Sequence, residues 1–478
     1  MDADKFVYAA LELGSSHIRG LLAYKDASGR VVPMASRSVE SSGCIVHGAI
    51  HNIDLVSSIA KEIIDAFNQE LADSNYKIAQ IYVSVNCRSL CSTRRIVTHT
   101  FEGDGTLVTE EDERLLKKEA LEEALPRHEL ISVLPPYYIV NGRREVSIVG
   151  MLCREVRAYY TLLSIRESYY QLIKMLVENR LGLKLAGILA TPICEAHVLL
   201  SSGVKQAGCA LVNIGADCTT VSVYKNAALE LLQVYPIGGA AITSDLTSLG
   251  ILREDAERLK CTKLSALSEL KDADIHVNVA TLDGASMRKM SLTDLNRCIQ
   301  ARMKEILVNV QNLVECSGVA NGLGAGYMFV GGTSLMKRFD RLLKDTGIKE
   351  YSLASSLNDK LFFAEHNTDK LFDNSAFYAG IVGAISMASQ GCLEAVMFMP
   401  SPSVEEEEGN DPEDVIEATQ SHSRGWIRGN RKSIPQDENP TPEPTKRGSR
   451  FSQFFNSMVS TAVGQKPDDV DYDDEQGE

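Results

Sequence analysis

A short apolar strand carrying a single polar residue, followed by a glycine turn and a second apolar strand, occurs twice in this chain. The first copy reads AALELGSSHIRGLLAY (9–24), and the second, about two hundred residues later, reads ALVNIGADCTTVSVY (210–224). This pattern predicts two related β-hairpins and hence two related half-domains. The polar residue and the glycine of each copy are Glu12 and Gly14, and Asn213 and Gly215.

The two glycine turns carry the first candidate chemistry. Glycine permits a tight turn whose amide N–H groups point outward, which is one way that proteins cradle phosphate oxygens. Either copy alone would be equally compatible with an ordinary hairpin of a sheet. The repetition, together with a third glycine site at Gly331 and Gly332, favours nucleotide binding.

Between these hairpins the pattern of apolar positions changes twice. Residues 6–81 alternate strands with a helix-period stretch, which is typical of an α/β domain. From about residue 83 to 164, short strands surround one charged helix, EEDERLLKKEALEEALP, and this indicates an inserted α+β module. The α/β pattern then resumes and continues to about residue 399.

The C-terminal part of the chain differs in composition and in its pattern of apolar positions. Residues 400–445 are acidic and proline-containing with few apolar positions, which predicts a disordered linker. Residues 446–466 predict a helix with one apolar face and basic flanks, and residues 467–478 form an acidic tail. An apolar helical face usually packs in a core, but the linker here favours a membrane surface or a partner groove. The membrane-facing positions are Phe451, Phe454, Phe455, Met458, Val459 and Val463.

Composition narrows the function classes. The 478 residues are 44% hydrophobic with a formal net charge of -15, which argues against a general nucleic-acid binder. Eleven cysteines without a paired CxxC frame suggest a reducing compartment rather than a disulfide scaffold or a zinc site. The N-terminus lacks the pattern of a secretory signal, and no apolar run is long enough to span a membrane. We therefore expect a protein of the cytoplasm or of the cytoplasmic membrane surface.

Three further segments, read together with these features, resemble the FtsA family of bacterial cell-division proteins. They are GCIVHGAIHNID (43–54), VLPPYYIVNG (133–142) and VYPIGGAAITSDL (234–246), and the resemblance covers residues 6–395 and the terminal helix. It implies an actin-like (ribonuclease H-like) duplicated α/β fold with an inserted subdomain. The implied subdomains are IA (1–83 and 163–205), IC (84–162), IIA (206–236 and 308–399) and IIB (237–307).

The resemblance also implies ATP in a cleft between the halves. Its phosphate loops match the two hairpin turns, an A-E-x-x-K helix matches AERLK for the ribose and base, and the Gly-Gly site matches the adenosine motif. An exposed ion pair on a helix is the alternative for the AERLK residues. The implied nucleotide-binding residues are Gly14, Ser15, Ser16, Gly215, Ala216, Asp217, Cys218, Gly239, Glu257, Lys260, Gly331 and Gly332.

The chain departs from actin-like ATPases where hydrolysis would occur. Those proteins usually place Asp in both phosphate loops, whereas Glu12 and Asn213 stand here. Asn213 removes a charge that would organise Mg²⁺, and Asp217 would place a charge near the phosphate oxygens. We expect Mg²⁺ to be held through water by Glu12 and Asn213, and we leave hydrolysis open and name no catalytic base.

The implied role is to hold the ring protein FtsZ at the inner face of the cytoplasmic membrane, at the septum, and to recruit later division proteins through IC. Self-association into filaments would strengthen attachment to anionic lipid. The FtsZ contact is expected at Arg302 and Glu305, where a solvated helix face is the alternative. Competing interpretations are a pilus-assembly scaffold of the PilM type and a small-molecule kinase of the same superfamily.

Overall fold

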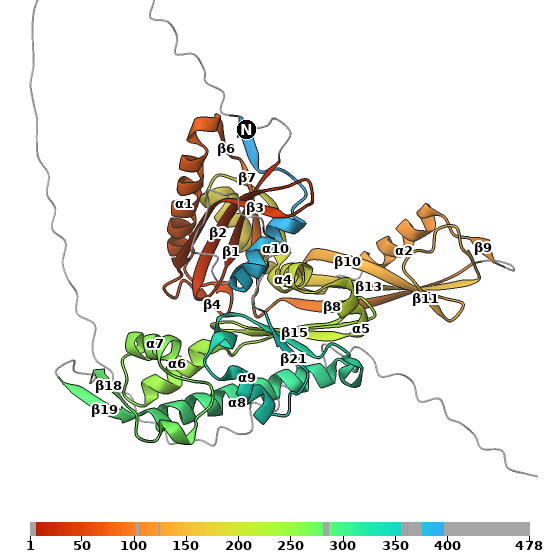
Figure 1. The fold of residues 1–478 in the computed structure, drawn as a ribbon. Coiled ribbons are helices and arrows are strands. Elements are labelled where there is room, and N and C mark those ends of the chain that lie inside the picture. The colour runs from red at the N-terminus through yellow and green to blue at the C-terminus, as the bar shows by residue number, and fades with distance from the viewer. Residues whose placement is uncertain are drawn as a thin grey trace, which may run out of the picture. The chain divides into compact units, whose positions relative to one another are not determined.

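The computed structural model describes residues 6–101, 105–122, 125–280, 286–354, 357, 361 and 375–395 (Figure 1). No helix within these ranges is long and apolar enough to cross a bilayer. The predicted linker, terminal helix and acidic tail lie outside the described residues, as do the membrane-facing positions Phe451, Phe454, Phe455, Met458, Val459 and Val463.

Two five-stranded sheets of identical topology form the framework and confirm the duplicated fold. In each, an antiparallel meander of three strands is extended on one side by two parallel strands, in the orders β3-β2-β1-β7-β14 and β17-β16-β15-β20-β21. The first sheet contains β1 (Val7–Leu13), β2 (His17–Lys25), β3 (Val31–Glu40), β7 (Gln80–Val85) and β14 (Lys184–Ala190). The second contains β15 (Cys209–Ile214), β16 (Thr219–Lys225), β17 (Ala228–Tyr235), β20 (Tyr327–Val330) and β21 (Tyr351–Leu353).

Helices cover these sheets with apolar faces that follow from the spacing of apolar residues in the sequence. Helix α1 (Ile53–Glu70) begins at Asn52, whose side chain accepts the Leu55 amide, and buries a face that ends at Phe67. Helix α8 (Leu292–Cys316) is longer and buries its apolar face in the core of the second half. The other helices are α3 (Glu167–Lys174), α4 (Thr191–Leu199), α5 (Ser202–Ala207), α6 (Gly239–Ser248), α7 (Arg253–Thr262), α9 (Phe339–Asp345) and α10 (Ala379–Met387).

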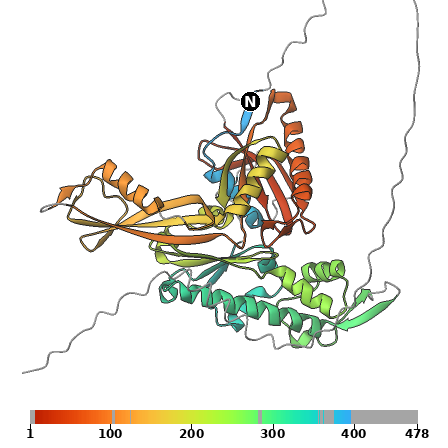
Figure 2. The ribbon, with the colours of Figure 1, turned by 180° about the vertical axis from the view of Figure 1, so that it is seen from behind.

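The predicted insertion forms a sheet of its own, which projects from the first half in both ribbon views (Figures 1 and 2). Its strands run in the order β11-β10-β13-β8, and a separate apolar core lies beneath α2. The side chains of Ser92 and Arg94 reach the backbone of the neighbouring strand β17. The elements are β8 (Cys91–Thr100), β9 (Thr106–Leu107), α2 (Glu110–Glu122), β10 (His128–Val140), β11 (Arg143–Glu145), β12 (Leu152–Cys153) and β13 (Glu155–Arg166).

The last described segment, 375–395, packs on the first sheet, although the sequence analysis placed it in the second half. Strand β22 (Leu393–Ala395) pairs with β6 (Tyr76–Ile78), and α10 joins the core of the first half. A Cβ added at Gly383 would lie 2.1 Å from the Cys194 carbonyl oxygen of α4, so the two helices touch through their backbones. Such long-range contact between small residues leaves no periodic signal in the sequence.

The smallest subdomain of the second half, with hairpin β18 (His276–Ala280) and β19 (Met287–Ser291), is fixed by a buried ion pair. The Asp272 side chain is 1% exposed and accepts two hydrogen bonds from the Arg338 guanidinium, at 2.6 and 2.9 Å. Asn296 of α8 donates a third at 3.1 Å. These hydrogen bonds and the Arg338 charge outweigh burial and hold the pKa of Asp272 below its usual range.

We predict that Asp272→Ala lowers the free energy of unfolding by about 2 to 4 kcal/mol, because Arg338 and Asn296 would lose their hydrogen bonds to a buried carboxylate. Urea denaturation followed by circular dichroism measures the change. Asp274→Ala, at an exposed position of the same loop, is the control and should stay within about 0.5 kcal/mol of wild type. Equal stability of the two variants would contradict the role given to Asp272.

Candidate functional site

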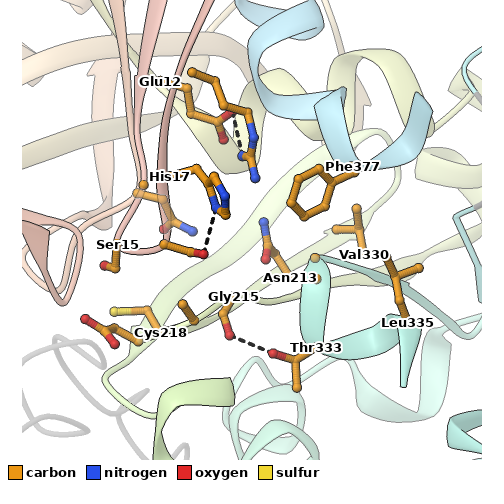
Figure 3. A pocket seen from close by; sticks show the side chains of 18 of the residues that line it. Glu12, Ser15, His17, Asn213, Gly215, Cys218, Val330, Thr333, Leu335 and Phe377 are labelled. Carbon is orange, nitrogen blue, oxygen red and sulfur yellow. Dashed lines mark hydrogen bonds and ion pairs between the residues drawn. The ribbon is translucent and has the colours of Figure 1, made fainter. Parts of the chain in front are cut away.

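The two hairpin turns face one cavity of about 580 Å³, shown from close by in Figure 3. This volume falls within the range of roughly 300 to 1,000 Å³ that is typical of small-molecule sites. Of the residues predicted to bind nucleotide or metal, only Gly239 is absent from the described lining. The lining includes Glu12, Gly14, Ser15, Ser16, Asn213, Gly215, Ala216, Asp217, Cys218, Glu257, Lys260, Gly331 and Gly332.

The first turn, between β1 and β2, is held by the loop that follows β3. Ser41 donates its amide to the Ser16 carbonyl at 2.9 Å, and the Ser15 hydroxyl accepts the Gly48 amide at 3.0 Å. The amides of Ser15 and Ser16 make no backbone hydrogen bond within the described ranges. They therefore remain available to an anion in the cavity.

The second turn, between β15 and β16, is held by the start of α6. The Gly215 carbonyl accepts the Gly239 amide and the Thr333 hydroxyl, both at 2.9 Å, and the second of these bonds is drawn in Figure 3. A Cβ at Gly238 would lie 2.5 Å from the Gly215 carbonyl oxygen, so a side chain there would displace the turn. Gly239 thus supports the turn from behind the cavity wall.

Asp217 joins the two halves of the molecule. Its carboxylate accepts the backbone amide of His47 at 3.0 Å, and its carbonyl oxygen lies 3.2 Å from the His47 ring nitrogen Nδ1. The sequence analysis expected the Asp217 charge next to phosphate oxygens. The side chain still lines the cavity, but its carboxylate is engaged by the loop between β4 (Ile45–Val46) and β5 (Ala49–Ile50).

Helix α7 supplies Glu257 and Lys260, an ion pair in which the Lys260 side chain is buried and the Glu257 side chain is about half exposed. Lys260 is 8% exposed, and its ammonium donates to the Gly239 carbonyl, the Thr243 hydroxyl and the Glu257 carboxylate at 3.0, 2.9 and 2.6 Å. Burial alone would raise the pKa of Glu257, but the hydrogen bond and charge of Lys260 lower it below the ordinary value. A fixed cation therefore lies beside the second turn.

Three residues that the sequence analysis did not single out shape the floor of the cavity. Arg19 of β2 pairs with Glu12 across the hairpin, with Nη1 and Oε2 3.3 Å apart, and its guanidinium carbon lies 4.0 Å from the centre of the Phe377 ring. Glu195 of α4 is 4% exposed and accepts the Asn213 side-chain amide.

Burial favours the neutral form of Glu195. Burial, reinforced by the nearby Glu12 charge, raises its pKa from 4.5 to about 8, although the Asn213 hydrogen bond and Arg19 oppose the shift. Its second oxygen, Oε2, has no hydrogen-bond partner within the described residues. The only sequence signal for Glu195 is a single acidic residue in the mostly apolar stretch ILATPICEAHVLL.

Arg302 of α8, expected to contact a partner, is bound within the molecule. Its guanidinium donates to both carboxylate oxygens of Asp245 on α6, at 2.7 and 2.8 Å, and also reaches Glu305. The Asp245 hydrogen bond is the main cause that raises the pKa of Arg302 above its ordinary value. Glu305 remains partly exposed, so this surface keeps an acidic group that a partner could reach.

We predict that Glu195→Gln flattens the pH dependence of stability. Between about pH 4.5 and 8 the folded protein keeps a proton on Glu195 that the unfolded chain has lost, so wild-type stability falls as the pH rises. As the pH rises from 5 to 8.5, the free energy of unfolding of the variant should increase by about 2 to 4 kcal/mol relative to that of the wild type. Urea denaturation at several pH values, without nucleotide or divalent cations, measures the free energy of unfolding of both proteins. The same pH dependence for wild type and variant would contradict the prediction.

Comparison of the amino-acid sequence with known proteins assigns the chain to a family. A family model described as "Cell division protein FtsA" matches residues 210–381. The chain is 34% identical over 390 residues to the cell division protein FtsA of Porphyromonas gingivalis, covering 82% of this chain and 80% of that protein. It is 28% identical over 346 residues to FtsA of Bacillus subtilis, covering 71% of this chain and 76% of the relative.

Among solved structures, the "PilM-PilN type IV pilus biogenesis complex" matches 79% of this chain and 97% of that chain, with a TM-score of 0.56 and 13% identity. At this identity the match establishes the actin-like fold alone. The identity to the P. gingivalis protein extends over most of both chains and is the observation that assigns a family. The chain therefore belongs to the FtsA family of cell-division proteins.

Proposed function

We propose that this protein binds a nucleotide in the cavity between its two halves and holds FtsZ at the inner face of the cytoplasmic membrane during division. The observation that carries the proposal is the pair of glycine turns that face one cavity in a chain of the FtsA family. Recruitment of later division proteins and self-association into filaments complete the proposed role.

ATP is the nucleotide that we propose. The Ala216 and Asp217 amides of the second turn, like the Ser15 and Ser16 amides of the first, make no backbone hydrogen bond within the described ranges. Two such turns suit a polyphosphate, which each half would contact from its own side. The fixed Lys260 charge lies next to the second turn, and Gly331 and Gly332 border the part of the cavity proposed for the adenosine. Hydrolysis is not part of the proposal, because none of the side chains that line the cavity is assigned as a catalytic base.

Membrane attachment is proposed for residues 446–466, where the sequence pattern predicts a helix with Phe454 and Phe455 on its apolar face and basic residues at its flanks. Each basic residue near anionic lipid contributes about 1 kcal/mol, so binding by one helix is reversible. Filaments would supply the multiple attachment that firm binding requires. The FtsZ contact is proposed for the α6–α8 surface around Arg302 and Glu305.

We predict that Gly331→Ala weakens binding of a fluorescent ATP analogue by at least about tenfold. Gly331 has a φ of +95°, and an added Cβ would lie 2.4 Å from Asn213 Oδ1, so the cavity wall would have to move. Gly347→Ala is the matched control, because Gly347 also has a positive φ (+84°), lies outside the cavity lining and has nothing within 4 Å of an added Cβ. Fluorescence anisotropy measures both; equal loss in the two variants would contradict the role of Gly331.

We predict that FtsZ sediments with anionic vesicles only when this protein is present, and that Phe454→Glu abolishes this effect. A carboxylate on the apolar face is costly to bury in lipid and is repelled by anionic headgroups. Phe454→Leu is the control and should retain most of the binding. Unchanged sedimentation of Phe454→Glu would contradict the anchor, and lipid binding without FtsZ would favour a PilM-type scaffold instead.

A further inference from the structure

The cavity floor contains a permanent cation where a nucleotide's metal ion was expected. Arg19 is 8% exposed and lines the cavity, wedged between Glu12 and the Phe377 ring. Its hydrogen bond to Glu12 is the only one that it makes in the described part of the chain, and its Nε has no partner there. A guanidinium is charged at every physiological pH and has five N–H donors, so most of its donors remain uncommitted.

The residues expected to hold Mg²⁺ do not fit that ion. Mg²⁺ prefers anionic oxygen ligands in near-octahedral geometry. The Glu12 charge is compensated by Arg19, and the Glu12 carboxylate packs so close to Gly380 that an added Cβ there would lie 2.8 Å from Oε1. Asn213 is uncharged; its amide nitrogen donates to Glu195 and its oxygen packs against the Gly331 backbone.

Two further acidic groups that line the cavity are already bound by other residues. Asp217 is bound by the His47 amide, and Glu257 is bound by Lys260 and Thr243. No three His, Cys, Asp or Glu side chains converge as a metal-binding group among the described residues. A divalent cation near Glu12 would also be repelled by the Arg19 guanidinium, which lies within hydrogen-bond distance of that carboxylate.

We propose that this cavity binds the polyphosphate of its nucleotide without a divalent cation, and that Arg19 supplies the positive charge that Mg²⁺ supplies elsewhere. The inference rests on the proposed nucleotide binding. A guanidinium can donate two parallel hydrogen bonds to a phosphate, which compensates charge and fixes orientation together. The free amides of the two turns and the Lys260 charge add to this attraction.

The test is equilibrium binding of ATP, by isothermal titration calorimetry, to the full-length protein in excess EDTA and in excess MgCl₂. The wild type should bind with dissociation constants that agree within about threefold in the two buffers, where tenfold would correspond to 1.4 kcal/mol. Binding that is at least tenfold weaker in EDTA than in MgCl₂ would overturn the inference while leaving nucleotide binding intact. Absence of binding in both buffers would overturn the proposed nucleotide site and this inference with it.

Substitutions of Arg19 and Glu12 at the cavity floor separate the effect of charge on binding from an effect on folding. Arg19→Met should weaken binding at least tenfold in EDTA and should make binding depend on Mg²⁺, because Glu12 is then free to attract the ion. The double variant Glu12→Gln/Arg19→Met removes both charges of the pair, so it tests whether an unpaired Glu12 disturbs the fold of the single variant. It should bind ATP weakly in both buffers. Arg37→Met, on the neighbouring strand β3 and outside the cavity lining, is the control and should bind as wild type. Wild-type affinity of Arg19→Met in EDTA would overturn the role of Arg19.

Discussion

The close approach of backbone segments around the second hairpin turn is the constraint on which the site depends. Gly238 and Gly331 both lie so near to the strand end of β15 that a methyl group at either position would overlap with its atoms. This proximity lets α6 donate its first amides to the turn and brings Thr333 onto the Gly215 carbonyl. The cavity wall is therefore built from main-chain contacts, which tolerate little displacement.

Compensation of buried charge is the second principle of the site. Lys260 is surrounded by three acceptors, and Arg19 is paired with Glu12 and stacked on an aromatic ring. Burial favours the neutral form of Glu195 by raising its pKa. An unpaired charge in these positions would be costly, so each group either has a partner or loses its charge. The cations of the cavity are thus paired, and Arg19 keeps uncommitted N–H donors that suit a polyanionic ligand.

The two halves also depend on each other. The Asp217 carboxylate binds the His47 amide across the cavity, and the insertion contacts β17 through Ser92 and Arg94. A ligand that contacts both hairpin turns would add to these links and would favour the arrangement in which the halves lie together.

The sequence by itself determined the duplicated sheets and the insertion, because these features are local, and the family resemblance pointed to about half of the residues that line the cavity. The strand-turn-strand pattern around Gly14 and Gly215 repeats within a few residues, and the helix-period stretches at α1 and α8 are read directly from apolar spacing. Only the tertiary structure decided that α10 packs on α4, that Arg19 and Glu195 meet at the cavity floor, and that Asp217 is bound by His47. These contacts join residues from separate elements, and their energies depend on burial and on charges that come together only when the chain has folded.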